Sequence, residues 1–224
     1  MLKNNKIALA VVATLFAGSV SAASLDARQE YKHGSEDWAS RIKMSGSVDN
    51  HFFGAEMKQK GKPFSEWEAA DNEFEYGYKF KVSDHWLIQP SMPVTFGSDS
   101  VTYKPQVRVQ YSFDSGVKAK LRYRHEFRDY NSDSSNENKN RSKVTGNIDY
   151  NWNAWQFGFE ANYAEDFIDN EWTGGGGADN EWDYNVKVGY KEADWSWRPY
   201  VEFGNVQDSR DRQLRSRVGI TYSF

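Results

Sequence analysis

The chain has 224 residues, of which 38% are hydrophobic, 16% aromatic and 27% charged, and its formal net charge is −4. Beyond its amino-terminal segment it has no run of about 20 apolar residues, which excludes membrane-spanning helices, and its aromatic content is too high for a disordered chain. The absence of cysteine excludes disulfide frameworks and cysteine zinc sites.

The amino-terminal segment has the features of a secretory signal peptide. Lys3 and Lys6 precede an apolar stretch at 7–18 that is too short to span a bilayer, and small residues follow it. We predict a signal peptide at 1–22 and a mature domain at 23–224; the alternative is an ordinary cytosolic helix. Loss of the two lysines lowers the formal net charge from −4 to −6.

The mature sequence alternates apolar and polar residues almost throughout, which is typical of strands with two different faces. In the last segment, for example, Val218 and Ile220 share the phase of Leu214, whereas Arg215 and Arg217 occupy the opposite phase. The pattern predicts twelve strands at 24–32, 38–49, 51–59, 73–82, 85–96, 101–113, 117–128, 143–152, 154–164, 182–191, 195–206 and 214–224.

Short and long connections also alternate along the chain. Short ones are expected at 49–50, 83–84, 114–116, 153 and 192–194, and longer polar ones at 60–72, 129–142, 165–181 and 207–213. An even number of antiparallel strands with short turns at one end and long loops at the other is typical of bacterial outer-membrane barrels. The predicted fold is therefore all-β: a 12-stranded antiparallel transmembrane β-barrel of the outer-membrane type.

A soluble antiparallel barrel is the alternative, because its strands also alternate. Its apolar face would point inward and its polar face outward, and such a core has no place for so many large aromatics. Tryptophans near strand ends instead fit the aromatic girdles of a membrane barrel. Two residues are awkward for this interpretation: Pro90 within a strand, which removes a ladder donor, and His125 on the lipid-facing phase.

Charge separates between the two faces. Pore-facing positions carry about nine more basic than acidic side chains although the mature chain is acidic. The clearest clusters lie on two neighbouring strands: Lys104 and Arg108 on the first, and Lys118, Lys120, Arg122 and Arg124 on the second. Rings of Arg or Lys are how pores prefer anions. The alternative is that cations pair across strands and fill a closed lumen, and such pairing is what we expect of Glu73, Glu75, Glu160 and Glu202.

Other motifs are weak. Four histidines and many serines and aspartates leave a barrel hydrolase open as an alternative, but nothing in the sequence brings a catalytic set together. The acidic, glycine-rich segment 165–183 could bind calcium through its aspartates. A solvated loop is the preferred interpretation.

Several stretches resemble the oligogalacturonate-specific monomeric porins, a family that also includes sialic-acid channels. The stretches are LDARQEY at 25–31, YKPQVRVQY at 103–111, LRYRHEF at 121–127, TGNIDY at 145–150, WRPYVEFGNV at 197–206 and RSRVGITYSF at 215–224. The resemblance implies a monomeric twelve-stranded barrel whose arginine-lined pore passes acidic saccharides. The long loops at 129–142 and 165–181 match poorly, so the particular sugar is left open.

The candidate pore residues come from two sources. The resemblance implies Lys104, Arg108, Arg122, Arg124, Arg198, Arg215 and Arg217, with Lys104 standing where the family often has arginine. The alternation adds Arg41, Lys43, Lys118 and Lys120.

Together these features predict a porin of the bacterial cell outer membrane that lets acidic oligosaccharides, such as oligogalacturonides, diffuse passively into the periplasm. We expect no catalytic step, no cofactor and no nucleic-acid partner. Outer-membrane lipid and lipopolysaccharide would surround a monomeric barrel. The alternatives are a channel for alginate oligomers or sialic acid, and a closed structural or adhesive barrel.

Overall fold

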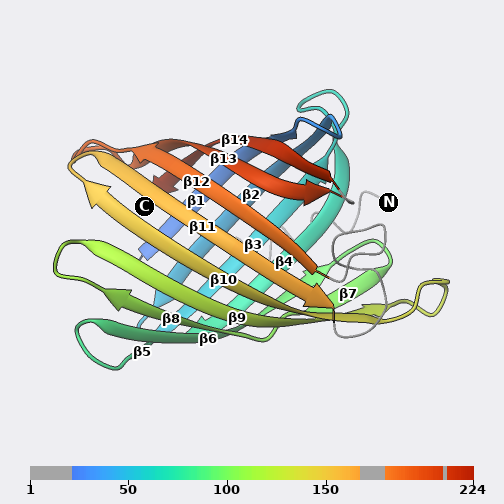
Figure 1. Cartoon of the computed structure of the whole chain (residues 1–224), viewed down its shortest axis with the longest axis horizontal. Coiled ribbons are helices and arrows are strands. Elements are labelled where there is room, and N and C mark those ends of the chain that lie inside the picture. The colour runs from blue at the N-terminus through green and yellow to red at the C-terminus, as the bar shows by residue number, and fades with distance from the viewer. Residues whose placement is uncertain (1–21, 167–179, 209–210) are drawn as a thin grey trace.

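Strands account for nearly all of the structure, a computed structural model that describes residues 22–166, 180–208 and 211–224 (Figure 1). The strands of these ranges are β1 (Ala22–Lys32), β2 (Asp37–Val48), β3 (His51–Lys60), β4 (Glu68–Tyr78), β5 (Phe80–Lys81), β6 (Trp86–Phe96), β7 (Ser100–Tyr103), β8 (Gln106–Ser112), β9 (Val117–Tyr130), β10 (Lys139–Trp152), β11 (Trp155–Asp166), β12 (Asn180–Tyr190), β13 (Trp197–Asp208) and β14 (Asp211–Ser223). Within the described ranges, no helix is long and apolar enough to cross a membrane.

The strands form one closed antiparallel barrel. Strands that follow one another in sequence pair, apart from β4 with β5 and β7 with β8, and β14 returns to pair with β1 from Ser24↔Ser223 to Lys32↔Arg215. β4 and β5 both pair with β6, so together they form one interrupted strand. β7 and β8 both lie between β6 and β9 and form a second interrupted strand. The twelve-stranded prediction is therefore confirmed, and closure pairs the backbone groups as lipid requires.

Proline explains where two strands are interrupted. Pro105 lies between β7 and β8, at the break in the predicted strand 101–113. Pro90 lies in β6 between its pairing with β4, which ends at Gly77↔Ser91, and its pairing with β5 at Phe80↔Ile88. The donor that Pro90 lacks therefore falls at a gap in the ladder, which is how a mid-strand proline is tolerated.

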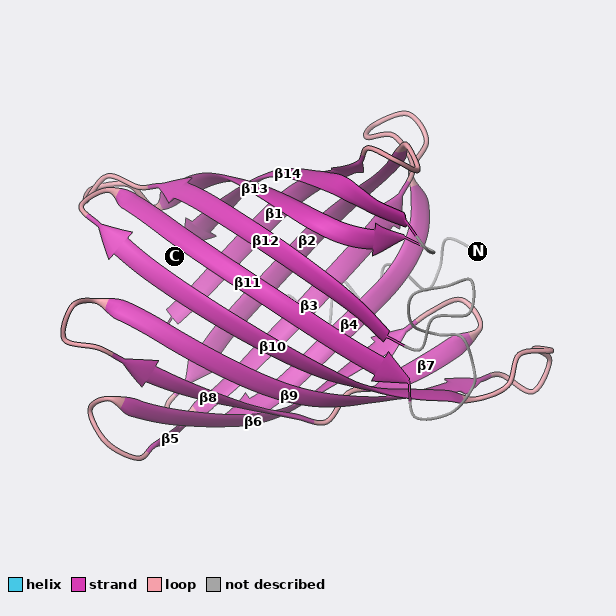
Figure 2. Cartoon of the chain, in the orientation of Figure 1, coloured by secondary structure: helices cyan, strands magenta, loops and turns pink. Residues whose placement is uncertain are grey.

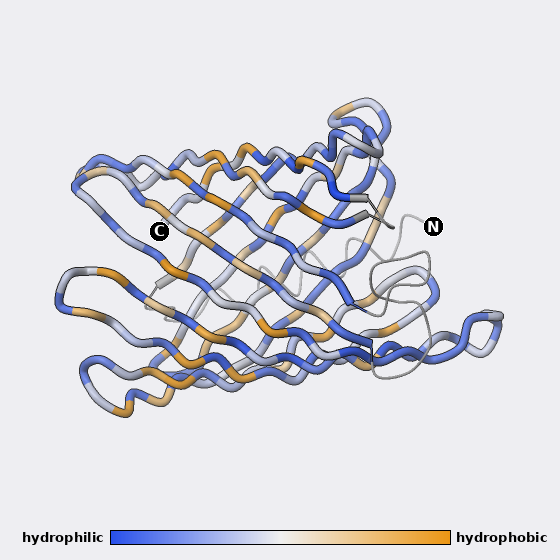
Figure 3. Tube along the Cα trace, viewed as in Figure 1, coloured by the Kyte–Doolittle hydropathy of each residue, from blue (hydrophilic) through white to orange (hydrophobic). Residues whose placement is uncertain are grey.

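The two walls of the barrel have opposite polarity. Hydrophobic and hydrophilic residues follow one another along the strands (Figure 3). Outward side chains such as Leu121 and Val218 are 59% and 63% exposed, whereas Glu126 and Thr145 are 2% and 1% exposed. This arrangement is the inverse of a soluble barrel, so the soluble alternative is wrong.

Connections gather at the two ends of the barrel (Figure 2). Tight turns follow β2 and β10, where Asp49 and Asn153 take left-handed φ values of 51°. All four of the longer loops are shorter than predicted: strands extend into the loops predicted at 60–72 and 165–181, because β4 begins at Glu68, β11 reaches Asp166 and β12 begins at Asn180. In place of the loop predicted at 129–142, β9 continues to Tyr130 and β10 begins at Lys139. The loop predicted at 207–213 is also wrong, because β13 and β14 stay paired as far as Asp208↔Asp211. Both segments are rich in polar residues, which predicts loops. Strands that extend beyond the membrane, however, carry polar residues on both faces.

Two expectations concern residues outside the described ranges. The predicted signal peptide 1–22 lies there except for Ala22, which begins β1. The middle of the candidate calcium segment, 167–179, also lies outside the described residues.

Candidate pore site

Inward-facing side chains surround a cavity of about 490 Å³ in the lumen. Its basic lining consists of Arg28, Arg41, Lys58, Arg108, Lys120, Arg122, Lys143, Lys187, Arg215 and Arg217. Its acidic lining consists of Glu56, Asp149, Glu160, Asp183 and Glu202. The strand period of two places these residues at alternate positions on almost every strand of the barrel. Among the described residues the cavity is therefore lined by an excess of cations.

The structure brings six of the eleven predicted site residues together at this cavity. They are Arg41, Arg108, Lys120, Arg122, Arg215 and Arg217. Lys43 lines a second cavity of about 490 Å³ toward the end where Phe224 lies, and Arg108 borders both cavities.

The other four predicted residues lie away from the main cavity. Lys104 pairs with Glu73 at 2.8 Å, and Arg124 contacts Glu126 at 3.3 Å. Arg198 donates to the side-chain oxygen of Gln156 at 3.1 Å. Lys118 is exposed near the short turn before β9.

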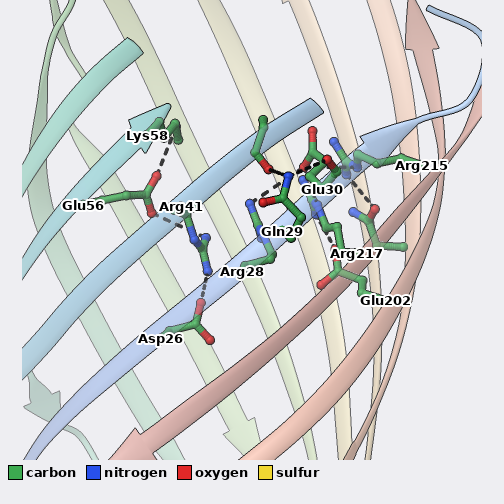
Figure 4. Close-up of polar contacts among 12 residues, drawn as sticks. Asp26, Arg28, Gln29, Glu30, Arg41, Glu56, Lys58, Glu202, Arg215 and Arg217 are labelled. Atoms are coloured by element: carbon green, nitrogen blue, oxygen red, sulfur yellow. Dashed lines mark hydrogen bonds and ion pairs between the residues drawn. The ribbon is translucent and has the colours of Figure 1, made fainter. Parts of the chain in front are cut away.

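One wall, made by β1, β2, β3 and the neighbouring β13 and β14, is largely charge-compensated (Figure 4). Arg41 lies 2.5 Å from Asp26 and 3.4 Å from Glu56, and Glu56 in turn contacts Lys58 at 3.0 Å. These acids and bases alternate across neighbouring strands, so each desolvated charge has a partner. This is the pairing expected of a filled lumen.

Arg217 continues this wall on β14. It lies 2.6 Å from Glu30 and also pairs with Glu202. Arg28 lies between Arg41 and Arg217, and its one ion pair with the described residues is a longer contact of 3.9 Å with Glu30. Arg28 is therefore the most weakly paired arginine of these three, and it lines the main cavity.

The wall made by β8 and β9 is different. Arg108 and Arg122 are register partners, so two like charges lie directly opposite each other. Neither makes an ion pair with the described residues, and the Nε atoms of both are buried without hydrogen-bond partners. Like charges opposite each other destabilise a sheet, and a buried donor without a partner is costly. An anion in the lumen would offset the repulsion between the two guanidinium groups.

A compact ion-pair network lies nearer the longer loops. Glu126 accepts from Arg141 at 2.7 Å, and Arg141 also reaches Glu181 at 3.7 Å. Arg141 was missed because the predicted strand began at residue 143. Extending the alternation back from Lys143 by one step would have found it, since β10 begins at Lys139.

Three of the four acids expected to pair with lumen cations do so. Glu73 pairs with Lys104, and Glu202 pairs with Arg217. Glu75 lies 4.0 Å from the Lys43 Nζ atom. Glu160 differs, because its carboxylate accepts from amide side chains and has no Lys or Arg within 4.0 Å among the described residues.

Neither a metal site nor a catalytic set is found in the described part of the lumen. No group of three or more His, Asp or Glu residues there could hold a metal ion. No histidine or serine lines the main cavity within these ranges. What the arrangement offers is a set of guanidinium and ammonium donors in a confined passage, which suits carboxylates.

The family model described as "Oligogalacturonate-specific porin protein (KdgM)" matches residues 16–224. The oligogalacturonate-specific porin KdgM of Dickeya dadantii (strain 3937) is 30% identical over 246 residues, which cover 98% of this chain and 99% of that protein.

Solved porins have the same fold. A structure of the NanC porin superposes with a TM-score of 0.75 at 21% identity, covering 88% of this chain and 98% of that one. A structure of the KdgM porin in complex with disordered oligogalacturonate superposes with a TM-score of 0.68 at 27% identity, covering 90% and 99%.

Proposed function

The chain belongs to the oligogalacturonate-specific porin (KdgM) family and is an outer-membrane porin, and we propose that its lumen passes acidic oligosaccharides such as oligogalacturonides. The observation that carries this proposal is the contrast between the two walls. One wall compensates its own charge, whereas Arg108 and Arg122 face each other without an acidic partner among the described residues.

Passage is passive and depends on transient charge pairing. Cations in a narrow wall of low dielectric focus the field and concentrate anions in the lumen. A guanidinium can donate two parallel hydrogen bonds to a carboxylate, so a uronate unit of an oligogalacturonide can pair with a lumen arginine. Binding at each site must be weak enough for release. Several partners spaced along the lumen satisfy this condition better than one tight site.

The remaining parts of the proposal have separate support. The basic and then apolar residues of 1–22 support a leader that is removed on export, and the resemblance to monomeric porins supports a monomer. Outer-membrane lipid and lipopolysaccharide contact the exposed aromatic residues of its outer wall. The channel catalyses no reaction and needs no cofactor.

The test is single-channel recording of the refolded mature chain in a planar bilayer. We expect anion-selective openings that trigalacturonate interrupts and that maltotriose, a neutral trisaccharide, leaves unchanged. Trimannuronate and N-acetylneuraminate, added in separate recordings, show whether the preference is for galacturonate. A folded barrel without current would indicate a closed structural barrel and would contradict the proposal.

A further inference from the structure

Glu160 of β11 lies at the centre of a group of amide side chains. Its Oε1 accepts from Asn162 at 2.8 Å and from Asn185 at 3.1 Å, and its Oε2 accepts from Asn147 at 2.8 Å. Asn162 and Asn185 are 6% and 4% exposed. An ionised carboxylate only accepts hydrogen bonds, so it determines which way each of these amides points.

This group extends to an arginine on each side. On one side Asn162 Oδ1 accepts from the Thr145 hydroxyl at 2.8 Å, and Thr145 Oγ1 accepts from Arg122 Nη2 at 2.8 Å. On the other side Asn185 Oδ1 accepts from Arg215 Nη2 at 2.7 Å. We call this chain of hydrogen bonds, from Arg122 through Thr145, Asn162, Glu160 and Asn185 to Arg215, the Glu160 relay.

The relay crosses β13 at a glycine. Arg215 is on β14 and Asn185 is on β12, so their contact passes over Gly204 of β13. A Cβ atom at Gly204 would lie 2.3 Å from Asn185 Oδ1. The absence of a side chain at this position is therefore what allows Arg215 to reach Asn185.

The direction of the hydrogen bonds shows what the relay does. Because Asn162 and Asn185 donate their amide nitrogens to Glu160, their oxygens face away from it and are free to accept. One oxygen orients the Thr145 hydroxyl toward Arg122, and the other receives Arg215 directly. Each arginine gives one Nη–H to the relay, and Arg215 also lies 3.9 Å from Glu30 through its Nε atom.

We propose that Glu160 is a positioning residue that holds Arg122 and Arg215 in place for the carboxylates of an acidic saccharide. Both arginines line the main cavity, so the donors that the relay leaves over are available to a solute there. A direct ion pair with Glu160 would have consumed the guanidinium donors. Amides placed between the charges orient the arginines and leave them able to bind. This inference rests on the proposed function.

The relay and simple electrostatics predict opposite results for Glu160→Gln. Removing a negative charge from the lumen raises its anion preference, and by charge alone it would strengthen block by trigalacturonate. A glutamine, however, keeps only a neutral carbonyl oxygen for Asn162 and Asn185 and presents an amide donor to Asn147, so the charge-assisted hydrogen bonds of the relay weaken and the arginines are held less firmly. We therefore expect anion preference to rise while block by trigalacturonate weakens by about tenfold, the effect of losing one hydrogen bond to a charged group.

Glu202→Gln is the matched control. Glu202 lines the same cavity and pairs directly with Arg217, without intervening amides. The same change of charge there removes one of the two acids that pair with Arg217 and leaves Glu30 as the other, so anion preference and block by trigalacturonate are both expected to rise. Thr145→Val provides a second test without a change of charge, because it removes the hydroxyl between Arg122 and Asn162 and is expected to weaken the block.

The outcomes separate the possibilities. Folding of each variant is checked by its heat-modifiable mobility in gels. Weaker block in both Glu160→Gln and Thr145→Val supports the relay. Stronger block in Glu160→Gln, as in Glu202→Gln, or wild-type block in Thr145→Val would overturn it. A wild-type channel that trigalacturonate does not block would overturn the proposed function, and with it the role of the relay in binding.

Discussion

At the scale of single residues, the value of a lumen charge depends on its partners. Arg108 and Arg122 oppose each other across β8 and β9, whereas Arg41 is enclosed by Asp26 and Glu56. Arg108 and Arg122 repel each other and attract anionic solutes. The pairing of Arg41 with its two acids stabilises the wall. Side chains of the same type therefore serve conduction in one place and stability in another.

Arg108→Gln tests the first role. Because Arg108 makes no ion pair among the described residues, its loss removes a cation that acts on solutes, and it also relieves repulsion with Arg122. We expect lower anion preference, measured as the reversal potential in a salt gradient, and no loss of stability. Lys118→Gln, at the exposed rim, removes the same charge and is expected to change the reversal potential less. An equal effect of the two substitutions would contradict the assignment.

Glu126→Gln tests the second role. Glu126 is 2% exposed and accepts from Arg141 at 2.7 Å. Removing its charge leaves buried cations without compensation, which costs about 3 kcal/mol of the free energy of unfolding. Urea unfolding in lipid vesicles measures this loss. Glu137→Gln, in the exposed loop between β9 and β10, is the control and is expected to unfold like the wild type.

At the scale of elements, glycine allows the strands near the closure to pack large polar side chains inside the barrel. Tyr200 of β13 is 4% exposed, donates to Asp26 at 3.1 Å and opposes Gly219 of β14. A Cβ atom at Gly219 would lie 2.3 Å from the Tyr200 ring. The ring therefore lies across the neighbouring strand and ties β13 to β1.

Gly219→Ala is expected to displace this ring. The added methyl group would break the Tyr200–Asp26 hydrogen bond or push β14 outward, and overpacking of this kind costs about 1–3 kcal/mol. Denaturant unfolding measures the cost. Gly146→Ala is the matched control, because nothing lies within 4 Å of a Cβ atom at that position. Similar stability of the two variants would show that Tyr200 does not need the space.

At the scale of the whole molecule, an acidic chain encloses a basic lumen. The full sequence has a formal net charge of −4, yet the main cavity is lined mainly by arginine and lysine. Net charge thus describes the outer rims and loops, whereas selectivity depends on the charges that line the passage.

This separation predicts a strong dependence on salt. Raising the ionic strength from 0.1 M to 1 M shortens the Debye length from about 10 Å to about 3 Å. We expect anion preference and block by trigalacturonate both to weaken across this range, measured by reversal potential and by the frequency of blocking events. Block that does not depend on salt would point to recognition of the sugar hydroxyls instead of the carboxylates.

The sequence predicts the number of strands better than it predicts where each strand begins and ends. The twelve strands followed from the alternation, but their ends did not: β10 begins at Lys139, so Arg141 was missed, and the loop expected at 207–213 is a paired hairpin. Alternating polarity indicates the two faces of a strand only where one face contacts lipid. Beyond the bilayer both faces contact water, so the alternation disappears although the strand continues.

The sequence by itself determined which side chains face the lumen. The period of two is a local property of an extended chain, and lipid on one side forces it to appear as alternating polarity. Only the tertiary structure decided which lumen charges are compensated. Arg41 meets Asp26 and Glu56, Arg108 meets Arg122, and Glu160 meets amides, because these encounters depend on register and on reach across neighbouring strands. The register is set by the hydrogen bonds of the whole closed barrel, so it cannot be predicted from the sequence of one strand.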